Sequence, residues 1–238
     1  MIKIDSNTKV VVLTGAGISA ESGIKTFRDS DGLWENHAIE DVATPYAWQQ
    51  NPELVWTFYQ KRREQLLEVN PNPAHHALAE IEQHIGENFL LITQNVDDLH
   101  ERGGSSNVIH MHGELRKLRC EDCQSVFEMM EEEHLTEDYV ACPDCGNERL
   151  RPHIVWFHEI PLQLEEIYYA VENCDVFMTI GTSGHVSPAS GLIYLANSCG
   201  ATCVGVNLDK PVNHDGHDQF HQGKAGELLP SLVKKWLV

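Results

Sequence analysis

The sequence is short of positive charge. It contains 17 lysine and arginine residues against 36 aspartate and glutamate residues, so its formal net charge at pH 7 is -19. A chain with this balance repels a phosphate backbone, which excludes nucleic acid as an expected direct ligand. It attracts lysine-rich protein segments, although an acidic surface that serves only solubility is the simpler interpretation.

Long apolar runs are absent too. No stretch approaches the roughly 20 apolar residues that a membrane-spanning helix requires, and residues 1–9 are too polar and short for a signal peptide. We therefore expect a cytoplasmic protein without a membrane partner. Its 238 residues, 42% of them hydrophobic, suffice for one large domain or for one domain that carries an insertion. The sequence does not determine an oligomeric state, and a monomer is plausible.

Cysteine is scarce and unevenly placed. Four of the seven cysteines form two C-x-x-C pairs, Cys120 with Cys123 and Cys142 with Cys145, and eighteen residues separate the pairs. Each pair can bind one side of a tetrahedral ion from its own tight turn. Four thiolates complete the coordination and leave no open position for water, so the spacing predicts a structural zinc ion and not a catalytic one.

The remaining candidates for metal or disulfide chemistry have simpler explanations. The other three cysteines lie in apolar stretches and are interpreted as reduced core thiols, at positions 174, 199 and 203. Histidines at positions 214, 217 and 221 fall in a polar stretch that we read as a loop and not as a second metal site.

Apolar runs of the β type recur along the chain with helical patterns between them. This alternation predicts an α/β fold, a Rossmann-like doubly wound parallel sheet. The clearest expected strands cover residues 10–13, 89–92, 176–180 and 202–206. Each strand runs into small or polar residues, and ligands of open α/β sheets bind at the carboxyl ends of the strands. We therefore expect one composite site at that edge.

Two stretches interrupt the alternation. Residues 31–83 are expected to form a helical module, because Asn51-Pro52 and Asn72-Pro73 are signals for helix starts. Residues 119–159 contain the paired cysteines and are expected to form a zinc ribbon. Together these modules make an inserted smaller domain. The Rossmann-like NAD-binding domain is then discontinuous and consists of residues 1–30, 84–118 and 160–238.

The first expected strand leads into a glycine-rich turn, TGAGISAESG, at residues 14–23. Such a turn can bring backbone N–H groups against a pyrophosphate. An ordinary NAD dehydrogenase is nevertheless disfavoured. The third glycine of its fingerprint falls at Ala20, which the fingerprint permits, but no acidic residue closes an obvious second strand about twenty residues later.

The combination of motifs carries more information than any one of them. The stretches concerned are GAGISAESGIKTFRDSDGLW (15–34), PNPAHHAL (71–78), TQNVDDLHERGG (93–104), HMHGEL (110–115), the two C-x-x-C pairs, RPHIVWFHE (151–159), GTSGHVSPA (181–189), VN (206–207) and GKAGELLP (223–230). In order and spacing they resemble the sirtuin family of NAD-dependent protein-lysine deacylases. The resemblance covers nearly the whole chain, which looks like a bare catalytic core of the bacterial type.

The resemblance implies a reaction and a catalytic base. In sirtuins the acyl-lysine carbonyl oxygen attacks C1′ of the nicotinamide ribose, nicotinamide leaves, and the acyl group ends on ADP-ribose. NAD is therefore expected as co-substrate and Zn²⁺ as a structural ion. By similarity, His112 is the base for a ribose hydroxyl and Asn95 orders a water near the ribose; an imidazole with a pKa near ~6.5 suits that task. No family motif gives His110 a chemical role, and we interpret it as a packing residue.

The resemblance also implies which residues contact NAD. Those expected at the phosphate turn and in the loop that covers the cofactor are Gly15, Ala16, Gly17, Phe27, Arg28 and Asp29, of which Phe27 would shield the reactive carbon. Those expected at the nicotinamide pocket and ribose are Gln94, Asn95 and Asp97. Those expected at the adenosine end are Gly181, Thr182, Ser183, Asn207 and Ala225.

The expected protein substrate is an acylated lysine segment. Val155, Trp156 and Phe157 match the family segment that pairs with the substrate backbone as a strand does. The family pattern breaks at the next position, where His158 replaces the usual glycine. A side chain there could crowd the substrate groove, so the effect of His158 on peptide binding stays open.

Two residues of the expected helix after Asn51 suggest the preferred acyl group. Tyr59 and Arg62 match the pair that lines the acyl pocket in the sirtuin subgroup acting on dicarboxylic acyl-lysines. This implies a desuccinylase or demalonylase that retains deacetylase activity. Periodicity alone favours a different interpretation, in which Arg62 packs its stem and extends its head to water.

Two alternatives belong to other classes. An NAD-sensing or scaffold protein without turnover would have a damaged catalytic set, whereas His112, Asn95 and Asp97 are all present. The alternative enzyme is a protein mono-ADP-ribosyltransferase, which shares the loss of nicotinamide. The two enzymes differ in the mass change of the reacted protein: loss of an acyl group against gain of ADP-ribose.

Overall fold

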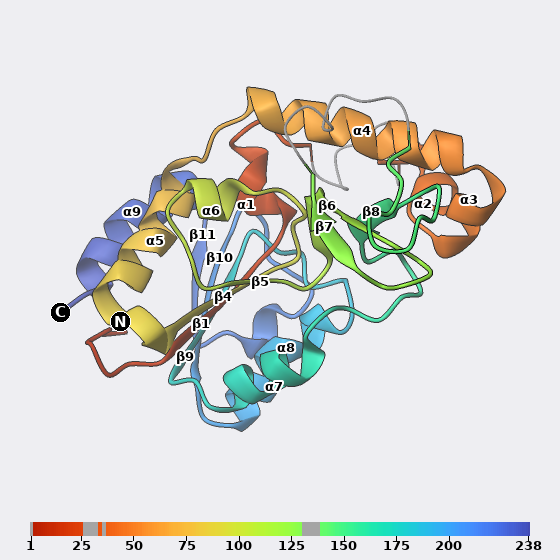
Figure 1. Ribbon diagram of the computed structural model, residues 1–238. Coiled ribbons are helices and arrows are strands. Elements are labelled where there is room, and N and C mark those ends of the chain that lie inside the picture. Colours follow the sequence, from red (N-terminus) through yellow and green to blue (C-terminus); the bar gives the residue numbers. More distant parts are fainter. Residues whose placement is uncertain (1, 26–32, 35–36, 130–138) are drawn as a thin grey trace.

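The computed structural model describes residues 2–25, 33–34, 37–129 and 139–238. Three residues of the expected cofactor-covering loop, Phe27, Arg28 and Asp29, lie outside these ranges. Figure 1 shows a large lobe built on a parallel sheet and a smaller lobe that contains α2 to α4 and β6 to β8.

The large lobe is organised by a six-stranded parallel sheet in the order β11-β10-β9-β1-β4-β5. The strands are β1 (Val10–Thr14), β4 (Phe89–Thr93), β5 (Val108–His110), β9 (Val176–Ile180), β10 (Thr202–Asn207) and β11 (Gln219–Gln222). Val10 pairs with Phe89 on one side and with Val176 on the other, so β1 is central. Its five residues are all buried, as expected of an apolar, β-branched run in a parallel sheet. The expected Rossmann-like sheet is confirmed.

Helices cover both faces of this sheet (Figure 1). One face packs against α5 (Pro73–Ile85) and α9 (Ala225–Trp236). The other packs against α7 (Leu164–Glu172) and α8 (Leu192–Ser198). The short elements of this lobe are α1 (Ala16–Ala20), α6 (Leu99–Arg102) and three 3-10 turns, Gly86–Asn88, Ala189–Gly191 and His214–Gly216.

The small lobe has a core of its own, rich in aromatic side chains such as Trp48, Trp56 and Trp156. Its helices are α2 (Ile39–Val42), α3 (Pro45–Gln50) and α4 (Pro52–Glu68). Its strands are β2 (Leu33–Trp34), which pairs with β3 (His37–Ala38), and an antiparallel sheet of β6 (Gly113–Arg119) between β7 (Val126–Glu128) and β8 (Arg151–Ile154). The Asn51 side chain accepts from Leu54 N at 3.1 Å, and Pro52 follows, which confirms the expected helix start.

Helix α5 packs on the large sheet, whereas the division of the chain expected from the sequence places it in the helical module. That division assigns residues 73–83 to the helical module, whereas α5 buries its apolar residues against β1, β4 and α9. A helical period shows which face is apolar but not which neighbour covers it. We therefore propose that the boundary between the helical module and the sheet domain falls between α4 and α5.

Among the residues that the structure describes, no helix combines the length and the apolar character that a membrane span requires.

Candidate active site

The carboxyl ends of β1, β4 and β9 are tied together by backbone hydrogen bonds. Gly15 N donates to Ile180 O at 3.0 Å, and Gln94 N donates to Thr14 O at 3.0 Å. Neighbouring parallel strands end at the same edge, so the turns that follow them meet. The composite site expected from the strand ends is thereby assembled at one edge of the sheet.

Glycine allows the turns after β1 and β9 to touch. Gly17 N donates to Gly181 O at 2.8 Å, and a Cβ at Gly17 would lie 2.8 Å from the same oxygen. Gly181 has φ +63°, and a Cβ there would overlap the backbone nitrogen of Ile18. Ala16, the first residue of α1, lies between the two contacts made by Gly15 and Gly17. A bare backbone surface of this kind lets a pyrophosphate approach closely, so the residues present fit NAD.

Side-chain amides extend the same edge. Gln94 Nε2 donates to Thr182 Oγ1 at 3.0 Å, and Asn207 Nδ2 donates to Thr182 O at 2.9 Å. Ser183 follows Thr182, and its carbonyl accepts from Val212 N at 3.1 Å. The structure thus brings together residues expected at opposite ends of NAD. Ala225 begins α9, where the next residue, Gly226, donates its N–H to Glu21 in the segment after α1.

A buried polar network follows β4. Asn95 Nδ2 donates to Gly15 O at 3.2 Å and to Ser19 Oγ at 3.1 Å, and Ser19 Oγ donates to Asp97 Oδ2 at 2.9 Å. Burial raises the pKa of Asp97 to about 6, against hydrogen bonds from Leu99 N and Ser19 that lower it. Ser19 was not among the expected site residues. Its only signal in the sequence is its place within the glycine-rich motif.

His112 lies directly beside this network. Its Nδ1 is 3.1 Å from Gln94 O, a carbonyl that only accepts, so Nδ1 carries the proton and Nε2 is the acceptor nitrogen. Burial lowers the pKa of His112 below the ordinary histidine value, although the Gln94 bond acts in the opposite direction. The ring is therefore neutral at neutral pH and can accept a proton.

The segment expected to pair with substrate runs between the two lobes. Val155 N donates to His112 O at 2.8 Å, and Phe157 N donates to Ala43 O at 3.0 Å. Phe157 is 42% exposed, whereas Trp156 is buried. His158 is exposed and has φ +74°, in the left-handed region. This conformation explains why glycine suits the position.

Tyr59 reaches the same segment from α4. Its side chain is fully buried, and its hydroxyl oxygen accepts from Trp156 Nε1 at 2.9 Å. Arg62 lies one helical turn further on and is half-buried, with its guanidinium carbon 4.7 Å from the centroid of the Phe58 ring. The structure therefore places Tyr59 next to an expected substrate residue. The contact of Arg62 with an acyl group stays a prediction.

An ion pair that was not expected from the sequence joins the two ends of the motif that contains the expected substrate-pairing segment. Arg151 binds Glu159 through two bonds, from Nη1 to Oε1 at 2.8 Å and from Nη2 to Oε2 at 2.9 Å. Glu159 also accepts from Trp156 N at 2.8 Å, and the Arg151 guanidinium lies 3.5 Å from the centroid of the Trp156 ring. The only signal in the sequence is that Arg151 and Glu159 are the first and last residues of the motif RPHIVWFHE.

The four paired cysteines form a compact cluster, with all Sγ atoms within 4.8 Å of one another. Cys120 and Cys145 are 3.5 Å apart, and Cys123 and Cys142 are 3.6 Å apart. A tetrahedral zinc ion with Zn–S bonds of about 2.3 Å separates its sulfurs by about 3.8 Å, so the residues fit zinc. Among the described residues, His214, His217 and His221 belong to no comparable group of metal ligands.

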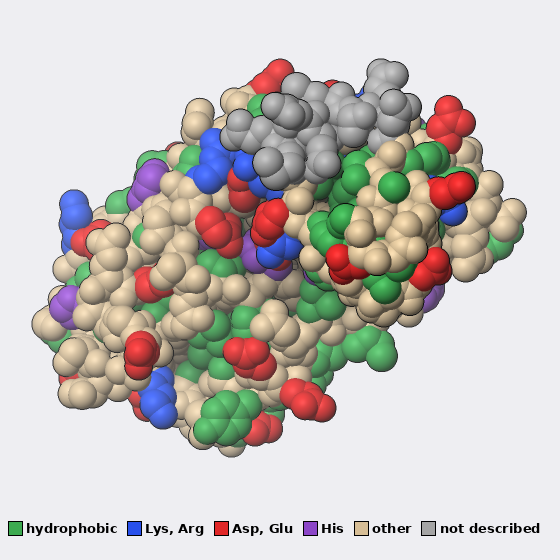
Figure 2. Space-filling view, in the orientation of Figure 1, with side chains coloured by type: hydrophobic (Ala, Val, Ile, Leu, Met, Phe, Trp, Pro, Cys, Tyr) green, Lys and Arg blue, Asp and Glu red, His purple; other side chains and the backbone are tan. Residues whose placement is uncertain are grey.

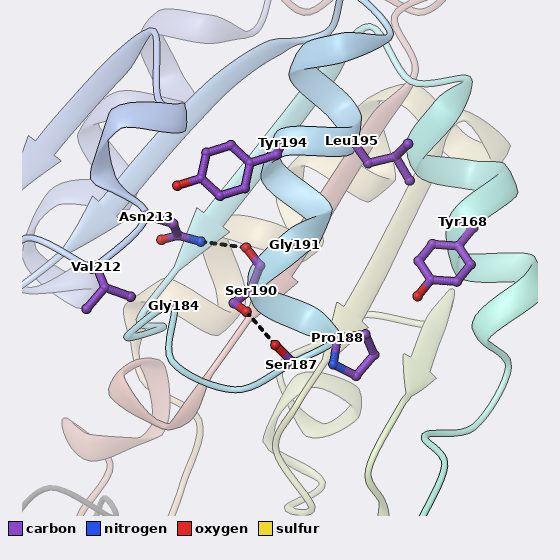
Figure 3. Close-up of a pocket in the computed structure, with 10 residues that line it drawn as sticks. All are labelled: Tyr168, Gly184, Ser187, Pro188, Ser190, Gly191, Tyr194, Leu195, Val212 and Asn213. Carbon is purple, nitrogen blue, oxygen red and sulfur yellow. Dashed lines mark hydrogen bonds between the residues drawn. The ribbon is translucent and has the colours of Figure 1, made fainter.

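A pocket outside this site borders the loop that continues from Ser183 (Figure 3). Asn213 Nδ2 donates to Ser190 O at 2.9 Å, and the hydroxyls of Ser187 and Ser190 are 3.3 Å apart. Gly184 has φ +72°, and a Cβ there would overlap the Asn213 amide. The pocket contains none of the expected site residues.

The acidic side chains show no single concentration on the visible face. Figure 2 shows them dispersed over both lobes. A net charge of -19 that is dispersed in this way agrees with the interpretation that the acidic surface serves solubility.

Comparison with protein families and curated proteins gives consistent matches. The model described as the Sir2 family matches residues 15–188, more than half of the chain. A protein of Pasteurella multocida (strain Pm70) is 49% identical over 231 residues, which are 96% of this chain and 98% of that protein. A protein of Shewanella oneidensis is 51% identical over 226 residues, which are 94% of this chain and 92% of that protein. Both carry the name NAD-dependent protein deacylase.

Solved structures agree with these matches. A Sir2 homolog in complex with NAD is 42% identical, with a TM-score of 0.87, and covers 97% of this chain and 90% of that one. The structure of Sir2Af2 bound to a myristoylated histone peptide is 34% identical, with a TM-score of 0.76, and covers 97% of this chain and 92% of that one.

We predict that zinc removal unfolds the zinc ribbon. A structural zinc ion contributes on the order of 10 kcal/mol or more to the fold that it organises. Cys142→Ala should therefore lose bound metal and lower the thermal midpoint. Cys199, interpreted from the sequence as a core thiol, is exposed in the structure and lies outside the cluster, so Cys199→Ala should change neither. Metal analysis and thermal unfolding are read together. A Cys142→Ala protein with an unchanged midpoint would contradict a structural ion.

We also predict that His158→Gly stabilises the protein. A residue with a Cβ in the left-handed region costs about 1–2 kcal/mol, which exceeds the backbone entropy cost of glycine of about 0.5–1 kcal/mol. The thermal midpoint should rise by a few degrees at most. His158→Ala is the matched control, because it removes the imidazole and keeps the Cβ. If both variants gain equally, the imidazole and not the backbone is the source of the effect.

Proposed function

The chain belongs to the Sir2 family and is an NAD-dependent protein deacylase, and from this premise we propose how its residues divide the reaction and which acyl group they favour. One observation carries the proposal. The glycine turns, Gln94, Asn95 and His112 meet at one sheet edge, and His112 O is bonded to Val155 N of the expected substrate segment. The NAD-side and peptide-side residues are therefore one connected structure.

His112 is proposed as the base for a ribose hydroxyl. When bound, NAD supplies a ribose carbon with nicotinamide as its leaving group. His112 accepts a proton at Nε2, because Nδ1–H is engaged by Gln94 O. Its lowered pKa keeps the acceptor form populated at neutral pH. Asn95 and Asp97, joined through Ser19, line the ribose side of the same site.

The peptide is proposed to bind along Val155 to Phe157. Main-chain hydrogen bonds in this mode tolerate many side-chain sequences, which suits an enzyme that acts on acylated lysines of several proteins. The bidentate Arg151–Glu159 pair and the bond from Trp156 N hold the segment in place before substrate arrives. The complex of Sir2Af2 with a myristoylated histone peptide is a family precedent for an acylated ligand.

Dicarboxylic acyl groups, succinyl and malonyl, are the proposed preference. The Tyr59 hydroxyl accepts from Trp156 Nε1, and its oxygen also carries a proton of its own. Burial raises the pKa of Tyr59, which keeps that proton in place. Arg62, one turn along α4, can add two charge-assisted hydrogen bonds to a carboxylate. An acetyl group offers no carboxylate to Arg62, so detectable deacetylation should accompany better desuccinylation.

Deacylation is favoured over mono-ADP-ribosyl transfer, because the relatives at about half identity carry the deacylase name. The measurement that separates them is the mass of the reacted protein.

Four thiolates gathered without a disulfide suit a reducing compartment, and we propose the cytoplasm as the location.

We predict that His112→Tyr folds and binds NAD but loses nearly all deacylation. Loss of a general base typically costs ~10²- to 10⁴-fold in rate. Calorimetry with NAD and turnover of an acylated peptide are measured side by side. His84→Tyr, at an exposed histidine of α5 outside the site, is the control and should keep wild-type turnover. Normal turnover in His112→Tyr would remove this residue from the mechanism.

We predict that Arg62→Met separates the acyl substrates. It should lower kcat/KM for succinyl-lysine peptide much more than for acetyl-lysine peptide, by up to ~10⁴-fold where the pocket excludes water and by less where it does not. Lys61→Met, at the preceding exposed position of α4, should leave the ratio unchanged. An equal loss on both substrates in Arg62→Met would show that Arg62 serves the fold and not the choice of acyl group.

A further inference from the structure

His110 contacts the same loop as the proposed base. His110 and His112 are two residues apart, and Met111 between them is buried in the core. His110 Nδ1 is 3.3 Å from Asn95 O, and His112 Nδ1 is 3.1 Å from Gln94 O. The two imidazoles therefore approach consecutive carbonyls. The parallel register, which pairs Thr93 with His110, brings this about.

The second nitrogen of His110 distinguishes it from a packing residue. Its Nε2 is 2.7 Å from Glu101 Oε1, while its Nδ1 faces a carbonyl oxygen. A carbonyl and an ionised carboxylate only accept hydrogen bonds, and a neutral imidazole has a single N–H. Both contacts are satisfied together only when both ring nitrogens carry a proton. The surroundings of His110 are thus built for an imidazolium, although the residue is only 7% exposed.

The groups around the ring support this charge state. Burial alone would lower the pKa of His110, but the hydrogen bond and charge of Glu101 outweigh it, with further support from Glu114, and the pKa is raised. The pKa of Glu101 is lowered: burial raises it, and His110 more than compensates. Asp97, after β4, is a further acidic neighbour, and His100 of α6 has its own pKa lowered well below the ordinary value.

The contact acts on the residue that lines the ribose. Asn95 already uses its side-chain Nδ2 toward Gly15 O and Ser19 Oγ, and its backbone N donates to Thr93 Oγ1 at 3.0 Å. Its carbonyl is the remaining backbone group, and His110 is the partner that holds it. Fixing this carbonyl fixes the peptide plane after Asn95, and with it the path of the chain to Asp97.

We propose that His110, as an imidazolium paired with Glu101, is a positioning residue that holds the Asn95 carbonyl and thereby orients Asn95 and Asp97 in the NAD site. The inference rests on the proposed function for its kinetic consequence. Turnover then needs His112 neutral and His110 charged, so the two histidines set opposite limbs of the pH profile.

The direction of the pH effect follows from the raised pKa of His110. The interaction is complete below the ordinary histidine pKa of about 6.5 and is lost as the pH rises through the higher value of the folded protein. His112, with its lowered pKa, is needed neutral and sets the acidic limb. As the pH increases, activity is therefore expected to rise when His112 loses its proton and to fall when His110 loses its proton.

The kinetic experiment measures kcat/KM for an acylated peptide with NAD across the pH range in which the protein stays folded. Glu101→Gln should move the alkaline limb to lower pH by at least about 1 unit, the effect of losing a close counter-ion. His110→Gln, whose amide donates to Asn95 O at any pH, should abolish that limb and retain activity. His110→Leu should lose about tenfold or more below the alkaline limb, where the wild-type contact is intact, and should approach the wild type above it. Glu172→Gln, on α7, removes a carboxylate elsewhere and should match the wild type.

A second measurement does not depend on turnover. The ¹⁵N signals of the His110 ring, identified by their loss in His110→Gln, should show an imidazolium that titrates above the ordinary histidine pKa. An alkaline limb that stays in place in both Glu101→Gln and His110→Gln overturns the proposal, and so does a ring that titrates at or below the ordinary value. Absence of deacylation in the wild-type protein with an imidazolium at His110 would instead count against the proposed function.

Discussion

The turns that follow β1 and β9 touch through bare backbone, with Gly17 N bonded to Gly181 O at 2.8 Å. A Cβ at either glycine would overlap the opposite turn, so no other residue type lets the two strands end this close together. The other contacts of the edge depend on this one. Gln94 reaches both Thr14 O and Thr182 Oγ1, and Asn95 reaches Gly15 O, because the turns are already side by side. These contacts are made by the protein's own groups, so this edge needs little ordering of the backbone when NAD binds.

A second connection crosses from the sheet to the small lobe. His112 leaves the edge of the sheet, and its carbonyl holds Val155 of the substrate segment. The segment is stiffened by the Arg151–Glu159 pair and, through Trp156, contacts the Tyr59 hydroxyl on α4. A chain of direct contacts thus runs from the nicotinamide side of the site to the proposed acyl pocket. The residue proposed to bind the ribose and the residue proposed to meet the acyl group therefore share one scaffold, which suits a reaction that joins the two substrates.

The sequence predicts those features that local patterns encode and misses those that depend on partners. Strand β1 is readable because a β-branched apolar run ends in glycine, and α4 is readable because Asn51 and Pro52 mark its start. The zinc cluster follows from spacing alone. Periodicity shows an apolar face on α5 but not that α9 covers it. The contacts of His110 with Glu101 and of Arg151 with Glu159 join residues that are close in sequence, but no local pattern predicts the turns that bring their side chains together.

The position of β1 has a consequence for biosynthesis. Of the six strands of the large sheet, β1 is the first to be translated, yet it lies in the middle of the sheet. Lys9, directly before it, bonds Asp175, directly before β9, across a separation of 166 residues. At about 5–20 residues per second, translation leaves β1 without this neighbour for roughly 10–30 s. During that interval the edge of β1 that faces β9 stays open even after β1 has paired with β4 on its other side, and an open apolar edge of this kind promotes association between nascent chains.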